Sequence, residues 1–247
     1  MRVSAAGSLA AGALATALVW EAIGRTHAFG SSFAPLSAVI AYVLVPQHQA
    51  VLADALARTG AEALAGLVLG SCAGVALAAL AAVAPRLAPG LGAFASLVNG
   101  IPIIAVAGVC VLTLPRDATP VVVSSLAAGF IVFVATSAGL GSALAAQRDV
   151  FAVLGATRAA TFARLLVPSA LPAIFDGLRS AASPAVVGAI VGEWFAAERG
   201  LGPLLVAAMQ NEAIDQLWAV AFCGALLSIA AYAVLGALRG AIVVRFS

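Results

Sequence analysis

The sequence predicts an all-α protein that crosses a membrane about six times. Of its 247 residues, 64% are hydrophobic and 9% are charged, and the mean hydropathy is +1.14. Soluble domains carry about 25% charged residues and about 45–50% apolar ones. The apolar residues also gather in runs close to the roughly 20 residues that a helix needs to cross a bilayer. We therefore expect lipid, not water, to surround most of the surface of this protein.

Six apolar runs are candidate spans. Turn-forming stretches separate several of them, notably APRLAPG at 84–90, PRDATP at 115–120 and AERGLG at 197–202. Backbone groups inside lipid must find partners within their own segment, which makes each run a helix. The expected spans lie near Ser8–Gly24, Gly60–Ala84, Leu91–Leu114, Pro120–Ala143, Leu178–Phe195 and Leu217–Leu238.

The first run allows two readings. Arg2 followed by apolar residues fits a cleaved signal peptide. Glu21 interrupts the end of the run and no A-x-A cleavage site follows, which favours a transmembrane helix. We therefore divide the chain into residues 1–50, an N-terminal helix with an external arm, and residues 51–247, a membrane core with a cytoplasmic loop at about 145–175.

The external arm runs over residues 25–59. Its apolar segment 32–45 is too short to span and is expected to lie at the membrane interface. His27 and His48 have no cysteine or carboxylate partner at metal-binding spacing, so we interpret them as surface residues.

Composition excludes several chemistries. All twelve basic residues are arginine, so the chain can hold no P-loop lysine, Schiff-base lysine or Ser–Lys dyad. No HExxH motif is present, and the two histidines lie outside the spans, which argues against an intramembrane enzyme. The net charge of +2 is too small to indicate a nucleic-acid partner. We expect no cofactor or metal, and we interpret the cysteines as small hydrophobic residues: Cys72, Cys110 and Cys223.

Arginine placement predicts the orientation, because cytoplasmic loops carry an excess of basic residues. With the N-terminus inside, seven arginines fall in inner segments: Arg2, Arg86, Arg148, Arg158, Arg164, Arg239 and Arg245. Four fall outside: Arg25, Arg58, Arg116 and Arg199. We therefore expect both termini in the cytoplasm.

This orientation leaves one long inner loop, between the fourth and fifth expected spans. Its apolar residues recur at roughly helical spacing, while Arg158 and Arg164 project elsewhere. Gly155 supplies a break or a point of close contact, and Pro168 and Pro172 are expected to end or bend helices. The residues alone leave open whether the loop stands in the cytoplasm or lies among headgroups, where its arginines would bind anionic lipid.

The loop reads Asp149-x5-Gly155-x9-Leu165-Leu166-Val167-Pro168. This spacing resembles the EAA loop of ABC-importer permeases, whose pattern is EAA-x3-G-x9-I-x-L-P. The stretches VPSALPAIFDGLR at 167–179, Glu193 to Gly202 and IPIIAV at 101–106 resemble the nitrate/sulfonate/taurine branch of that family. The resemblance covers about residues 51–240. Of the EAA triplet only the acid is kept, because this chain has Asp149-Val150-Phe151.

The resemblance implies a type I, MetI-like permease in a bacterial inner membrane. Its coupling helix, roughly 147–156, would enter a groove on a separate dimeric ATPase, which would bind ATP and Mg because this chain has no Walker A lysine. The other implied partners are a second permease subunit, in a homodimer or a heterodimer, an extracytoplasmic binding protein and membrane lipid.

The resemblance also implies roles for individual loop residues. An apolar plug would consist of Val150, Phe151, Val153 and Leu154. Gly155 would allow close approach of the ATPase, with Ala156 ending the helix. Asp149 would cap the helix start or pair with an ATPase arginine.

The remaining loop roles concern charge and re-entry into the membrane. Arg158 and Arg164 would pair with acids of the ATPase or with lipid phosphates. Pro168 and Pro172 would orient the re-entry of the chain and transmit the motion.

Polar residues inside the expected spans are candidates for the translocation pathway, because unpaired polar groups are costly in lipid. The candidates are Asn99, Pro102, Ser124, Thr136, Ser183 and Glu193. Serine and threonine in membrane helices commonly bond to backbone or pack helices instead. Glu193 is expected to be a gate, a docking residue or a solvated rim charge.

An ion-coupled secondary transporter of small solutes is the alternative. Such proteins place carboxylates near the bilayer midplane. The acids in or near the expected spans lie at span ends: Glu21, Glu62, Asp176 and Glu193. The solute stays open among nitrate, sulfonates, taurine, pyrimidine vitamin precursors and aromatic acids, and a small polar organic molecule is expected.

Overall fold

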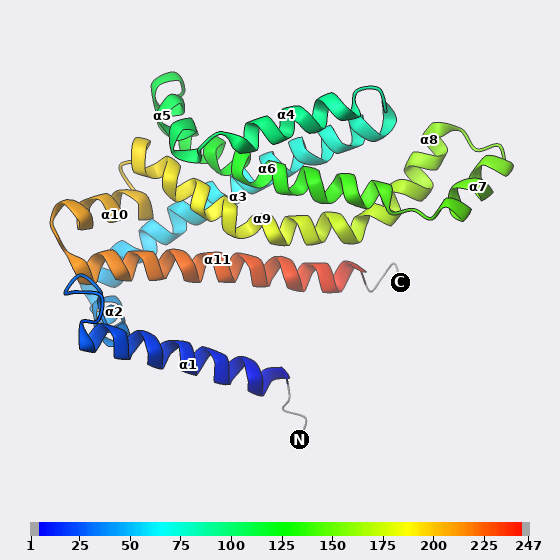
Figure 1. Cartoon of the computed structure of the whole chain (residues 1–247). Helices are drawn as coiled ribbons and strands as arrows, with labels where there is room; N and C mark the ends of the chain where they lie inside the picture. The colour runs from blue at the N-terminus through cyan, green and yellow to red at the C-terminus, as the bar shows by residue number, and fades with distance from the viewer. Residues whose placement is uncertain (1–4, 244–247) are drawn as a thin grey trace.

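The computed structural model describes the backbone of residues 5–243 and the side chains of residues 7, 8 and 10–240. Over this range every regular element is a helix (Figure 1). Its elements are α1 (Ala5–Thr26), α2 (Leu36–Leu44), α3 (Pro46–Val83), α4 (Ala88–Gly100), α5 (Ile103–Thr113), α6 (Ala118–Gly141), α7 (Ala145–Val153), α8 (Arg158–Thr161), the π-helix η1 (Phe162–Leu166), α9 (Val167–Ala196), α10 (Leu201–Gln210) and α11 (Ile214–Val243). Arg2 and Arg245, which support the expected orientation, lie outside the described residues.

The bundle is built around α6, which packs against α3 on one side and α9 on the other, while α11 lies along α9 (Figure 1). Small and β-branched residues fill these seams, including Ala128, Val132 and Ala181. Interiors of membrane bundles rely on such close packing because lipid tails are as apolar as the side chains they would replace.

Glycines at four-residue spacing on α3 allow its close approach to α6. An added Cβ would overlap Ser124 at Gly66, the backbone of Ser125 at Gly70 and the backbone of Gly129 at Gly74. The Gly-x3-Gly-x3-Gly pattern predicts such packing within one subunit, and the structure confirms it.

Gly70→Ala is therefore expected to destabilise the bundle by roughly 1–3 kcal/mol, because its methyl group would meet the Ser125 carbonyl. Gly108→Ala in α5 is the matched control, since an added Cβ there meets nothing within 4 Å. Thermal unfolding of the purified protein in detergent measures both. Equal unfolding temperatures for the two variants would contradict this account of the seam.

Among the described residues, four helical segments are long and apolar enough to cross a membrane: Pro46–Val83, Arg116–Gly141, Arg158–Ala196 and Ile214–Gly240. A fifth results if α4 and α5 count as one span. The expected span at 8–24 corresponds to the helix α1. Because some side chains in its first turns lie outside the described ones, this span stays a prediction. The second expected span starts much earlier than predicted, since α3 begins at Pro46.

The third expected span, 91–114, is not one straight helix, which corrects the prediction. It breaks between Gly100 and Ile103, and α4 and α5 meet at 89°. Pro102 lacks an N–H and disfavours helical backbone in Ile101, which is extended here with ψ of 128°.

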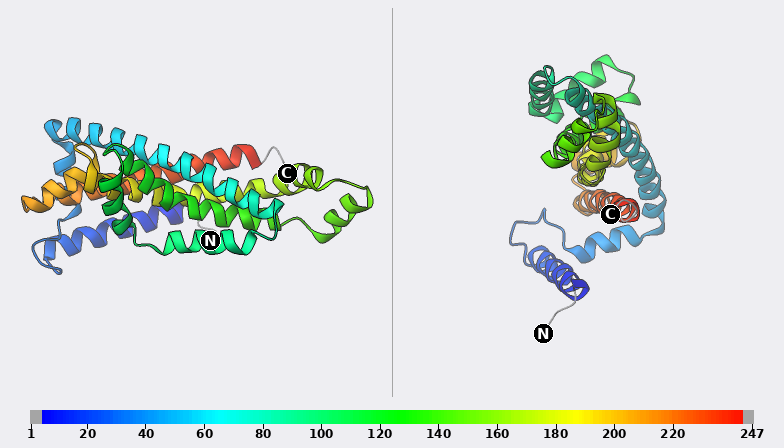
Figure 2. Two further views of the ribbon diagram at one scale, coloured as in Figure 1. Left: turned by 90° about the horizontal axis from the view of Figure 1, so that it is seen from above. Right: turned by 90° about the vertical axis from the view of Figure 1, so that its right-hand side faces the viewer.

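The N-terminal helix α1 joins the rest of the chain at one end only. Trp20 packs against Phe33, Trp218 and Phe222, and its indole Nε1 donates to Ala34 O at 3.0 Å. From this cluster α1 runs away from the bundle (Figures 1 and 2). The short α2 follows it, and the expected division at residue 50 falls inside the continuous helix α3.

The two ends of the bundle differ in what they carry. One end, the α7 end, holds α7, α8 and the close of α11, and the start of α1 points toward it (Figure 1). The opposite end, the α10 end, holds α10, the turn between α1 and α2, and the start of α6.

Candidate functional site

Helix α7 stands beyond the end of the bundle, connected to it by two short segments (Figures 1 and 2). Its first turn is closed by Gln147, whose Oε1 accepts from the N–H of Leu144 at 3.1 Å. Arg148 reaches back and donates to the carbonyls of Leu140 and Gly141 at 3.3 and 3.4 Å. These carbonyls end α6, so Arg148 ties α7 to the last turn of α6.

Gly155 ends α7 in a Schellman motif. Gly155 N–H donates to Ala152 O at 3.0 Å, and Ala156 N–H donates to Phe151 O at 2.9 Å. Gly155 has φ of +68°, a left-handed conformation that glycine adopts without steric cost. An added Cβ would meet nothing within 4 Å, so no described part of the chain packs on that side of Gly155.

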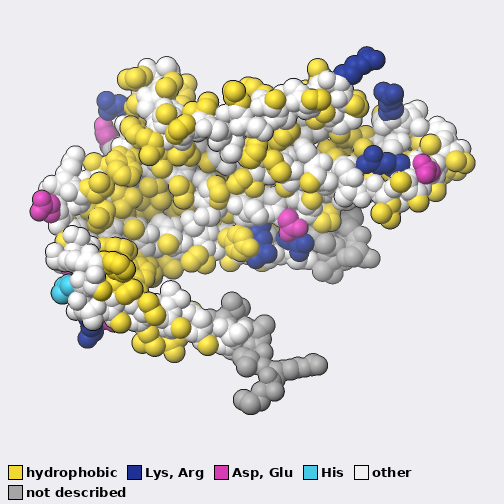
Figure 3. All heavy atoms as spheres, viewed as in Figure 1, with side chains coloured by type: hydrophobic (Ala, Val, Ile, Leu, Met, Phe, Trp, Pro, Cys, Tyr) yellow, Lys and Arg dark blue, Asp and Glu magenta, His cyan; other side chains and the backbone are white. Residues whose placement is uncertain are grey.

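The C-terminal part of α7 and the residue that follows it expose apolar side chains. Val150, Val153 and Leu154 are 56%, 87% and 76% exposed, whereas Phe151 is half-buried. Apolar side chains accordingly cover the tip of the projection (Figure 3). Exposed apolar patches of this kind mark sites of contact with another protein or with a membrane.

Residues 158–166 lead from α7 back to the bundle. One face of this segment packs against the bundle and the other carries arginines. Phe162 and Leu166 pack against the cluster of Ala78, Phe133 and Leu140. Arg158 and Arg164 are exposed, and neither forms an ion pair with the described residues.

The coupling segment differs from the prediction in its bounds. The helix covers Ala145–Val153 instead of 147–156, so Asp149 lies in its middle and does not cap its start. Neither Pro168 nor Pro172 ends a helix, since α9 contains both. The π-turn at Phe162–Leu166, where Val167 N–H bonds to Phe162 O, precedes Pro168. Such turns recur at functional sites.

At the α10 end, Glu193 lies at the centre of a buried hydrogen-bond network. Its Oε1 accepts from the Thr59 hydroxyl at 2.6 Å, and its Oε2 accepts from Gly202 N–H at 2.8 Å. Thr59 in turn accepts from Leu201 N–H at 3.0 Å. Glu193 is 0% exposed, so the expectation of a solvated rim charge is wrong. The network joins α3, α9 and the start of α10.

Two further charged residues of α3, Arg58 and Glu62, adjoin this network. The sequence analysis did not identify them as part of a site. Glu62 is 5% exposed and accepts from Arg58 Nε at 2.6 Å, while its Oε2 is buried without a partner among the described residues. An arginine four residues before a glutamate within an apolar run was the available signal.

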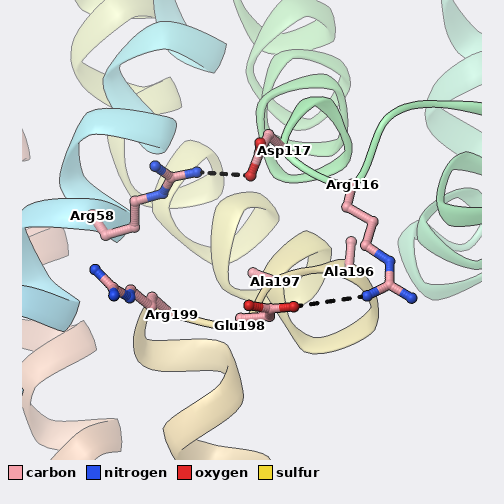
Figure 4. A pocket seen from close by; sticks show the side chains of 7 residues that line it. All are labelled: Arg58, Arg116, Asp117, Ala196, Ala197, Glu198 and Arg199. Atoms are coloured by element: carbon pink, nitrogen blue, oxygen red, sulfur yellow. Dashed lines mark hydrogen bonds and ion pairs between the residues drawn. The ribbon is translucent and has the colours of Figure 1, made fainter.

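A polar cavity of about 310 Å³ opens at the α10 end. Figure 4 shows Arg58, Arg116 and Arg199 around it, with Asp117 and Glu198 between them. Arg58 pairs with Asp117 at 3.2 Å, Arg116 approaches Glu198 at 4.0 Å, and Arg199 has no ion pair within the described part of the chain.

The pathway candidates separate into two groups. Asn99, Pro102 and Ser183 are exposed on this subunit. Ser124 and Thr136 are buried, and the Ser124 hydroxyl donates to Ala185 O at 2.9 Å, which joins α6 to α9. Among the described residues, no three His, Cys, Asp or Glu side chains gather as metal ligands.

A family model for the binding-protein-dependent transport system inner membrane component matches residues 66–247. The chain belongs to this family. Two relatives are similar to it in sequence. The formylaminopyrimidine transport permease protein ThiX of Halalkalibacterium halodurans is 43% identical over 103 residues, which cover 41% of each chain. A probable ABC transporter permease protein of Haemophilus influenzae is 27% identical over 216 residues, 87% of this chain and 88% of the relative.

A solved structure has the same fold. It is an inward-facing conformation of the MetNI methionine ABC transporter, which aligns with a TM-score of 0.65 at 16% identity. The alignment covers 78% of this chain and 99% of that one. The chain is therefore an ABC-transporter permease with a MetI-like fold, and its family supplies the inner membrane component of such transporters.

Proposed function

We propose that this permease forms the translocation pathway of an importer for a small polar solute and is driven through α7 by a separate ATPase. The observation that carries the proposal is the projecting helix α7, whose apolar face has no partner within the described chain. Apolar surface in water is unfavourable, so a second protein that covers Val153 and Leu154 would stabilise the assembly. We place this end in the cytoplasm, with both termini.

The position of α7 also suits it to transmit motion. Arg148 bonds to the last carbonyls of α6, and α8 and η1 continue directly into α9. A force on α7 therefore reaches the two helices that form the main seam of the bundle. An ATPase that binds α7 differently in two states would change the populations of two bundle conformations, as alternating access requires.

The break between α4 and α5 supports a translocation pathway along the face of the bundle that carries these two helices. Asn99, Gly100, Ile101 and Pro102 are exposed on this subunit. Irregular backbone at membrane depth is tolerated where it is covered by protein or lines a water-filled cavity. We infer that this break faces the aqueous pathway or the second permease subunit.

The cargo proposal draws on the named relatives. ThiX is a formylaminopyrimidine transport permease, and its similarity to this chain makes a small polar heterocycle, such as a pyrimidine, the first solute to test. An external binding protein would deliver it to the α10 end. The nitrate/sulfonate/taurine branch stays a prediction, to be tested with the same binding protein.

Gly155 variants test the coupling role. Gly155→Asn is expected to retain solute-stimulated ATP hydrolysis, because asparagine tolerates the φ of +68°. Gly155→Val is expected to lose about 5- to 30-fold, because a β-branched residue is strained there and would unwind the end of α7. ATP hydrolysis by the co-purified transporter in liposomes, with the loaded binding protein added, measures both.

Thermal unfolding of the membrane subunit serves as the control, because Gly155 contacts nothing in the bundle and neither variant should shift it. Full coupled activity in Gly155→Val would refute the role of α7. Absence of any ATP-binding subunit from the purified complex would refute the importer itself.

A further inference from the structure

A charged cluster lies on the shared face of α9 and α11, toward the α7 end. The guanidinium of Arg239 on α11 pairs with Asp176 on α9 through two contacts, at 2.5 and 3.1 Å. Both side chains remain accessible, with 35% and 52% of their surface exposed. Basic and acidic side chains meet there within an otherwise mostly apolar surface (Figure 3).

A second arginine beside this pair, Arg179, forms no ion pair with any residue of the described range. The guanidinium of Arg179 lies 4.0 Å from the ring centre of Tyr232, over its face, and close to Gly236 one turn further along α11. Arg179 Nε is buried and has no hydrogen-bond partner in the described part of the chain. Gly236 leaves room for this flat arrangement, because an added Cβ would sit 3.0 Å from Arg179 Nε.

The cluster therefore has two cations and one anion. The carboxylate of Asp176 pairs with Arg239. The positive charge of Arg179 is therefore not neutralised by Asp176, and its terminal N–H groups remain free to bind an anion. A planar guanidinium stacked on an aromatic ring is held in one orientation, which favours recognition of an oxyanion.

The depth of the cluster matches a membrane surface. Asp176 lies about 20 residues before the end of α9 at Ala196, or ~30 Å along the helix. Tyr232 lies about 18 residues after the start of α11 at Ile214, or ~27 Å. The hydrocarbon core is about 30 Å thick, and tyrosine is enriched at its boundaries. If the α10-end termini of these helices mark one interface, this cluster lies at the other.

We propose that Arg179 and Arg239 bind the phosphate of an anionic phospholipid headgroup at this interface. Tyr232 orients Arg179, Asp176 orients Arg239, and the surrounding apolar surface receives the acyl chains. The occupant is lipid because the cluster is exposed at headgroup depth, carries a net positive charge and is bordered by apolar side chains.

The test measures lipid binding by the purified full chain in neutral detergent, using native mass spectrometry with added phosphatidylglycerol or phosphatidylcholine. Wild type is expected to retain phosphatidylglycerol preferentially. Arg179→Gln and Arg239→Gln are each expected to weaken this retention about fivefold. Arg86→Gln, which removes an exposed arginine from the 84–88 turn at the same end, is the matched control and should change it little.

Two further variants separate lipid binding from folding. Arg179→Lys keeps the charge and should retain part of the lipid preference. Asp176→Asn frees Arg239 and should tighten phosphatidylglycerol binding.

Three outcomes would overturn the proposal. One is an equal loss of phosphatidylglycerol retention in Arg86→Gln, which would show that any exposed arginine contributes through its charge. Another is equal binding of soluble glycerol phosphate, which would show a phosphate site without lipid. The third is a change in oligomeric state in Arg179→Gln with lipid retention unchanged, which would assign the cluster to a second copy of the chain.

Discussion

Leu154→Asp is expected to uncouple the transporter while leaving the membrane bundle folded. Leu154 is 76% exposed in this subunit, so a charge there meets water before the ATPase binds. In the proposed complex the same charge would be buried against an apolar groove without a partner. The loss of affinity for the ATPase is expected to be about 30-fold or more, the size of a central interface residue. Titration of the purified ATPase onto the permease in detergent measures it.

Leu87→Asp is the control for this experiment. Leu87 precedes α4, is 52% exposed and is not part of α7. It should leave ATPase affinity unchanged. If Leu154→Asp binds the ATPase as tightly as wild type, α7 is not the coupling surface, whatever the activity of the assembled transporter.

Replacement of Glu193 is expected to have the second large effect, on stability. Glu193→Ala would leave Thr59 and Gly202 N–H without their buried acceptor and would open a cavity, at a cost of roughly 3–5 kcal/mol. Glu193→Gln keeps the volume but turns an amide donor toward one of these donors, at about 1–3 kcal/mol. Both should lower the unfolding temperature of the purified permease.

Glu198→Gln is the matched control, because Glu198 lies just past the end of α9 and its side chain is 90% exposed. It should unfold as wild type does. A double-mutant cycle with Thr59→Val should be non-additive, since both changes remove the same hydrogen bond. Additive effects would show that Thr59 and Glu193 act separately.

Much of the fold follows from apolar periodicity and breaks. The all-helical class, the positions of the later spans and the close packing at Gly66 and Gly70 could be predicted, because lipid forces helices and small residues permit contact. The 89° break within 91–114 could not be placed reliably, because Pro102 is compatible with a kink, a break or a continuing helix. The start of α3 at Pro46 was hidden by polar residues such as Gln47 and Asp54.

The site was predicted unevenly for a similar physical reason. Local signals, such as Gly155 at a helix end, are visible in sequence because the backbone conformation depends on neighbouring residues. One partner of Glu193, Thr59, lies 134 residues away, and nothing in either local sequence indicates that the two side chains meet. The aromatic contact between Trp20 and Trp218 joins residues still further apart in the sequence. Such long-range pairs require the fold.

The water-facing tip of α7 has a consequence for the cell that makes this protein. In the proposed arrangement, a copy produced in excess of the ATPase would expose the apolar side chains of Val153 and Leu154 to the cytosol. Permease copies without an ATPase would then be prone to aggregation and to degradation by proteases. If α7 couples to the ATPase as proposed, matched synthesis of the two proteins would keep this apolar surface covered, and one short helix would set the ratio in which they are needed.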